Sequence, residues 1–178
     1  MKLPVAVVLV AVVSAAISSV SAASPAARNA GATSVNRVWR DAQASLAVGY
    51  PDSWHVTTRN LTNITQPVPR FAIYSGASPR RVAVTRGEFT QGLRSDQVMG
   101  IVMEQTSVSP ADLRRLPRRP HRFTVSRLTG VEGFGDRWVE FFFRDHGREF
   151  YVFVGVGKHG ARHLPTLLHS LDTLRVGG

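Results

Sequence analysis

Hydrophobic and polar side chains alternate along much of this chain, with the two-residue period of strands that bury one face. Leu46, Val48 and Tyr50 alternate with small or polar neighbours. Trp54 and Val56 begin a second strand after the turn at 51–53. Further runs of β character are, in order, 70–76, 80–87, 98–103, 137–144 and 148–156. Short loops connect the first of these runs to the second and the fourth to the fifth, so we predict two antiparallel pairs.

Two segments have the pattern of helices. Ser109 and Pro110 provide an N-cap followed by a proline in the first helical turn, and Pro117 ends this short helix. Four leucines between Leu164 and Leu171 recur at helical spacing and predict one amphipathic C-terminal helix. Hairpins with helices at intervals predict an α+β fold, an antiparallel sheet flanked by helices.

The first 22 residues have the features of a secretory signal peptide. Lys2 is followed by an apolar run from Leu3 through Val13, and small residues lead to an expected cleavage after Ala22. Residues 23–37 are rich in Ala, Ser and Asn and predict a flexible leader, so we expect the folded domain at 38–176. A retained membrane anchor is the alternative, which the short apolar run disfavours. The expected location is secreted or extracytoplasmic.

Composition narrows the function classes. The chain has no cysteine, which excludes a disulfide framework, a thiolate metal site and a cysteine nucleophile. Its net charge is +10, and without Lys2 of the signal peptide it is 21 − 12 = +9. A strongly basic domain is attracted to anionic surfaces. Nearly all basic residues are arginine, so the codon usage of a GC-rich bacterial genome is an alternative source of this charge.

Two segments resemble a known family. LAVGYPDSWHVTTRNLT at 46–62 is similar to the opening of PsbP-like domains, in which a short strand, Tyr-Pro and a nearby Trp precede a second strand. LLHSLDTLRV at 167–176 resembles the closing helix and tail of small secreted actinobacterial members. The resemblance implies an antiparallel sheet with helices on both faces, with the rings of Tyr50 and Trp54 buried. It also implies a binding or assembly module rather than an enzyme.

The densest basic segment lies at 114–122, where five of nine residues are arginine: Arg114, Arg115, Arg118, Arg119 and Arg122. Guanidinium groups pair bidentately with phosphate and carboxylate, and the prolines of the segment favour an extended, accessible backbone. This segment is the candidate contact with an anionic surface. A solvated loop without function is the alternative, and no nucleic-acid fold signature accompanies the segment.

Three further patterns are weighed against simpler explanations. Residues 155–160 form a literal G-x-G-x-x-G, but too little chain follows for a dinucleotide-binding βαβ unit, so we predict a strand-to-helix connection. His159, His163 and His169 lack neighbouring acids to complete a metal site, so we expect surface histidines. The acids Glu140, Asp145 and Glu149 are interleaved with arginines at 137, 144 and 148, which predicts cross-strand ion pairs rather than a glycosidase.

The sequence thus predicts no catalytic, cofactor-binding or metal-ligating residue. The first hypothesis is a secreted, non-enzymatic PsbP-like domain that binds a protein or envelope component of unknown identity. The second is an electrostatic binder of anionic cell-envelope polymer or membrane through the segment at 114–122. A small hydrolase is a third alternative, and it requires a pocket that gathers an acid or histidine with a nucleophile.

Overall fold

The computed structural model describes residues 34–58, 61, 66–76, 93–132 and 134–177. The expected signal peptide, most of the expected leader and the expected strand at 80–87 lie outside these residues. Residues 31–178 form one compact unit. None of the helices described is long and apolar enough to cross a membrane.

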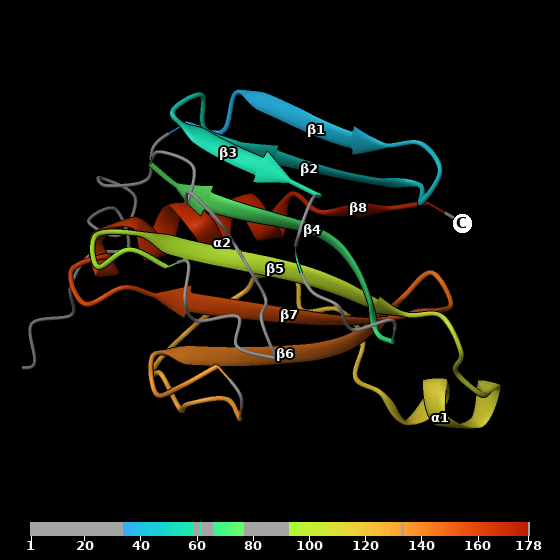
Figure 1. Ribbon diagram of the computed structural model, residues 1–178. Helices are drawn as coiled ribbons and strands as arrows, with labels where there is room; N and C mark the ends of the chain where they lie inside the picture. Colours follow the sequence, from blue (N-terminus) through green and yellow to red (C-terminus); the bar gives the residue numbers. More distant parts are fainter. Residues whose placement is uncertain (1–33, 59–60, 62–65, 77–92, 133, 178) are drawn as a thin grey trace, which may run out of the picture. The chain divides into compact units, whose positions relative to one another are not determined.

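Most strands belong to one antiparallel sheet (Figure 1). Its order is β3-β4-β5-β7-β6. The bounds are Trp54–Thr57 for β3, Val68–Ser75 for β4, Val98–Gln105 for β5, Trp138–Asp145 for β6 and Arg148–Val156 for β7. The predicted hairpin is confirmed, because β6 and β7 pair through eight residues on either side of the turn. His146 and Gly147 have φ angles of 48° and 72° there, the left-handed backbone that tight hairpins require.

A second, three-stranded sheet has the order β1-β2-β8. Its strands are β1 (Arg37–Asp41), β2 (Leu46–Tyr50) and β8 (Arg175–Val176). Alternation in β2 follows the predicted pattern: Leu46, Val48 and Tyr50 point into the core. Strand β1 begins one residue before the domain boundary expected from the sequence.

The two α-helices have different roles. α1 (Pro110–Arg115) has the predicted Ser109 cap and buries no side chain. A short 3₁₀ turn, η3 (Ala161–His163), leads into α2 (Leu164–Asp172), which packs Leu167 and Leu171 against the five-stranded sheet. Gly100 of β5 permits this contact, because a Cβ there would lie 3.1 Å from Leu167 Cδ1. The predicted α+β class, an antiparallel sheet with a flanking helix, is confirmed.

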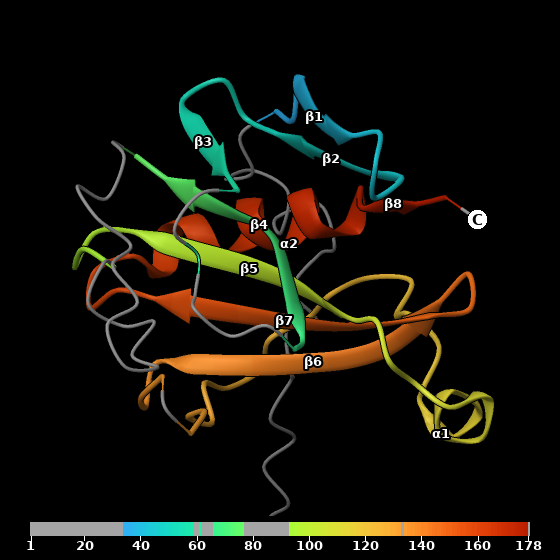
Figure 2. The same ribbon diagram turned by 45° about the vertical axis from the view of Figure 1, so that its right-hand side comes forward.

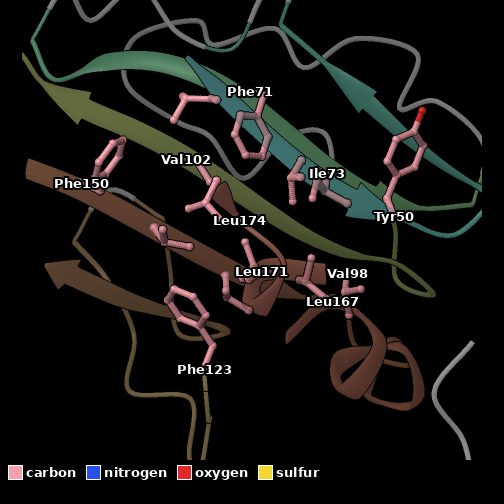
Figure 3. Packing of buried hydrophobic residues seen from close by; sticks show 14 of the residues in the cluster. Tyr50, Phe71, Ile73, Val98, Val102, Phe123, Phe150, Leu167, Leu171 and Leu174 are labelled. Atoms are coloured by element: carbon pink, nitrogen blue, oxygen red, sulfur yellow. The ribbon is translucent and has the colours of Figure 1, made fainter. Parts of the chain in front are cut away.

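Each face of the five-stranded sheet has its own apolar cluster. The larger cluster lies between this sheet, α2 and the three-stranded sheet, and its members include Phe71, Val102 and Leu171 (Figures 2 and 3). The predicted burial of the Tyr50 and Trp54 rings is confirmed, since both belong to it. The opposite face carries a smaller cluster around Phe134, Trp138 and Phe153.

Candidate anion-binding site

The extended segment at 117–119 lies along the outer edge of β6. The Arg144 N–H donates to Pro117 O at 2.8 Å, and the Arg119 N–H donates to Arg144 O at 3.0 Å. These bonds pair Arg118 with Arg144 as parallel-strand neighbours. Pro117 and Pro120 cannot continue α1, so the chain after α1 stays extended and meets this edge.

This pairing places the backbones of two arginines, Arg118 and Arg144, side by side. Paired residues of neighbouring strands lie ~5 Å apart with side chains on the same face. Arg118 is exposed, and Arg144 donates its Nε–H to Leu116 O at 3.1 Å. Among the described residues, neither arginine forms an ion pair. Glu149 of β7 lies opposite Arg144 of β6, but their side chains do not form an ion pair.

The Arg119 side chain points to the other face, where its hydrogen bonds stabilise the fold. Its Nη2 donates to Asp172 O at 2.9 Å, and its Nη1 donates to Leu174 O and to Asp145 Oδ2, the latter at 3.2 Å. Asp172 is the last residue of α2. A cation at a helix C-terminus satisfies carbonyls that have no partner in the helix. The Arg119 side chain therefore links α2, the chain after it and the β6–β7 turn.

These residues surround a pocket of about 390 Å³. Its lining is Arg118, Arg119, Arg144, Asp145, His146 and Gly147. The Asp145 carboxylate also contacts His146 Nδ1 at 2.8 Å. The three guanidinium groups and one carboxylate of this lining together carry a charge of 3 − 1 = +2. The pocket is suited to an anionic group that accepts hydrogen bonds from Arg118 and Arg144.

Only part of the arginine segment expected from the sequence lines the pocket. Arg118 and Arg119 reach the pocket, whereas Arg114, Arg115 and Arg122 do not line it. Arg114 and Arg115 lie exposed in the last turn of α1, where Arg115 contacts Asp112 at 3.4 Å. Sequence reasoning missed Arg144, which it had assigned to ion pairing within the hairpin.

No family model, curated protein or solved structure matches this chain. The PsbP-like resemblance therefore stays a prediction that rests on the opening and closing motifs. The candidate site is interpreted from its own geometry.

The expected cross-strand ion pairs between the acids and arginines of the hairpin are wrong, because these residues have other partners. In the β6–β7 register Asp145 lies opposite Arg148, yet Asp145 contacts Arg119. Arg148 instead holds Glu104 of β5, with its Nε and Nη2 each at 2.7 Å from a carboxylate oxygen. A local pattern does not reveal this partner, because Glu104 is 44 residues away in sequence and approaches Arg148 only through the pairing of β5 with β7.

Arg137 also has another partner than expected, since it donates to the carbonyls of Val156 and Gly157 at 2.7 and 3.0 Å.

Glu104 is a buried carboxylate held by two arginines. Arg70 of β4 donates to it as well, at 2.7 Å, and the Glu104 side chain is only 8% exposed. Burial alone would raise the pKa of Glu104, and this is the largest single influence. The hydrogen bonds and charges of Arg148 and Arg70 together outweigh it, so the pKa is lowered from its ordinary value of 4.5. This cluster joins three strands near the end of the sheet.

The acids considered for hydrolysis do not form a pair. Glu140 lies opposite Phe153 and Glu149 opposite Arg144, so four positions along β6 separate them. Burial raises the pKa of Glu140. A hydrogen bond to Glu149, with burial and the charge of the same acid, raises the pKa of Tyr151 to about 12. The arginine pocket contains Asp145 and His146, but its lining has no serine, threonine, cysteine or tyrosine to act as a nucleophile.

The glycines at 155–160 serve packing. A Cβ on Gly157 would lie 2.2 Å from Arg94 O, and one on Gly160 would lie 2.1 Å from Gln97 O. The Gly157 N–H donates to Gln97 O at 2.8 Å, and the His159 N–H donates to Ser95 O at 2.6 Å. The loop borders a cavity of about 330 Å³. Since these two N–H groups already have acceptors, they do not serve as a phosphate cradle of the dinucleotide-binding type.

The three histidines are dispersed. His159 and His169 are exposed, whereas His163 is half-buried with its ring 6.2 Å from that of Trp54. Burial, with the charge of Arg162, lowers the pKa of His163, and Asp96 partly opposes this. Within the described residues, no three His, Asp or Glu side chains gather as a metal site would require.

Proposed function

We propose that this chain is an extracytoplasmic, non-enzymatic binding domain that holds an anionic group of the cell envelope between Arg118 and Arg144. The observation that carries the proposal is the backbone pairing of these two arginines, neither of which forms an ion pair among the described residues. Like charges directly opposite each other on neighbouring strands are unfavourable. A phosphate or carboxylate group between them would convert this repulsion into two charge-assisted interactions.

Arg119 supports the same proposal in another way. It contributes charge to the pocket while its hydrogen bonds hold it in place. A fixed guanidinium loses little conformational freedom when a ligand binds, which favours affinity. The proposed ligand contact is therefore narrower than the whole basic segment at 114–122.

Membership of the PsbP-like superfamily is part of the proposal. It is supported by the confirmed α+β class and by the buried Tyr50 and Trp54 of the opening motif. Non-enzymatic binding is consistent with a pocket lining of arginine, aspartate, histidine and glycine that contains no hydroxyl or thiol nucleophile.

Binding of the purified protein to isolated cell envelopes tests this function. The Arg118→Gln/Arg144→Gln variant is expected to lose envelope binding. The matched control is Arg114→Gln/Arg115→Gln, which removes the same two charges from the exposed end of α1. It is expected to keep most of the binding. Equal losses in both variants would show that net charge and not the pocket determines binding.

A further inference from the structure

The pocket lies at one end of the domain, where other basic residues gather. In both views the β6–β7 turn, the β1–β2 turn and the C-terminal end of β8 lie at the same end (Figures 1 and 2). The last two belong to the three-stranded sheet. Binding at this end therefore has access to two sheets rather than one.

Arg119 connects the pocket to the three-stranded sheet. Its guanidinium donates to Leu174 O, and Leu174 is followed directly by Arg175, the first residue of β8. The Cα atom of Arg175 therefore lies next to the carbonyl group that Arg119 binds. The Arg175 side chain is exposed, whereas its neighbour Val176 points into the core.

Two further arginines lie on the outer face of the three-stranded sheet. Arg175 of β8 lies opposite Ala47 of β2, and Ala47 lies opposite Arg40 of β1. Two strand spacings place the two arginines ~10 Å apart, with only a methyl group between them. Arg40 is exposed, and none of the ion pairs among the described residues involves either arginine.

We propose that the ligand is a flexible polymer with repeating phosphate or carboxylate groups, which runs from the Arg118–Arg144 pocket over Arg175 to Arg40. This inference rests on the proposed function and specifies its ligand. A single small anion occupies the pocket and leaves Arg175 and Arg40 without a counter-charge. A chain of anions can neutralise both sites, and its flexibility lets it follow a surface that passes from one sheet to the other.

Calorimetric titration with orthophosphate, tripolyphosphate and long-chain polyphosphate tests the proposal. The wild-type affinity per chain is expected to rise with length. Arg40→Gln/Arg175→Gln is expected to bind orthophosphate like the wild type but to lose the gain with length. If each of the two lost contacts lowers the salt slope by ~0.7, as for single-stranded polyanions, raising salt from about 50 to about 200 mM weakens wild-type binding of the long chain about sevenfold more than that of the variant.

Controls separate this inference from the proposed function. Arg114→Gln/Arg115→Gln removes equal charge and is expected to keep the dependence on length; loss of that dependence would contradict the assigned path. If orthophosphate binds but affinity does not rise with chain length, the polymer inference is overturned and the anion-binding pocket is retained. No binding of any phosphate would overturn both. Tighter binding to phosphatidylglycerol vesicles than to long polyphosphate would identify a membrane surface and contradict the polymer.

Discussion

Comparing Arg119→Gln with Arg118→Gln tests whether two adjacent arginines have different roles. We expect Arg119 to stabilise the fold and Arg118 to bind the ligand. Arg119 is 21% exposed and donates to the carbonyl groups of Asp172, the last residue of α2, and Leu174, and to the Asp145 carboxylate. Arg118 is exposed and forms no ion pair among the described residues. The two changes remove the same charge from the same segment, so a stability difference between them reports contacts.

The magnitude follows from these contacts. A hydrogen bond to a charged group contributes ~1.5–3 kcal/mol, and a glutamine retains part of the hydrogen bonding, so we expect Arg119→Gln to cost about 2–4 kcal/mol. For a domain of this size that corresponds to a Tm lower by roughly 6–12 °C. Arg118→Gln is a surface change and is expected to stay within about 0.5 kcal/mol of the wild type.

Thermal unfolding followed by circular dichroism, with urea unfolding as a second measurement, checks this difference. Arg119→Lys is a useful companion, because it keeps the charge but has no planar fork to reach several oxygens. We expect it to recover only part of the stability. Equal Tm values for the Arg118 and Arg119 variants would refute the assignment of Arg119 to the C-terminal end of α2.

Three further outcomes follow from the structure. Ser170→Ala is expected to stabilise the protein by about 1 kcal/mol in urea unfolding, because the fully buried Ser170 Oγ has no hydrogen-bond partner in the described structure; destabilisation would contradict this. The lowered pKa of Glu104 means that its contribution is complete above about pH 4.5 and is lost as the pH falls through the folded-state pKa, so the stability difference between wild type and Glu104→Gln should shrink from pH 6 to pH 3; a constant difference would argue against the two-arginine cluster. Gly160→Ala is expected to lower the Tm by at least roughly 6 °C, since its Cβ would meet Gln97 O; an unchanged Tm would show that the loop shifts freely.

Local patterns were sufficient for most strands and for both helices. The β6–β7 hairpin, for example, needs only alternating residues and a turn containing Gly147. The three-stranded sheet could not be predicted in the same way. Its β2–β8 pair joins Leu46 to Val176, almost the whole domain apart in sequence, and β8 has only two residues.

The candidate site was predictable in part. The prolines around Arg118 and Arg119 indicated an extended segment, and extended segments send consecutive side chains to opposite faces. This alternation alone predicts that the side chains of Arg118 and Arg119 point in opposite directions. The strand edge along which this segment lies could not be predicted from the sequence, because its pairing with Arg144 depends on tertiary packing. For the same reason local alternation suggested partners for Arg148 within its hairpin, whereas Glu104 comes from β5.

The most direct test of the central claim is an NMR titration of the protein with orthophosphate, observed at the arginine Nε–Hε resonances. We predict saturable shifts concentrated at Arg118 and Arg144, with small changes at Arg114 and Arg115. Arg118→Gln/Arg144→Gln should abolish the saturable component. Shifts spread evenly over all exposed arginines, or an unchanged titration in that variant, would contradict an anion-binding pocket at this position.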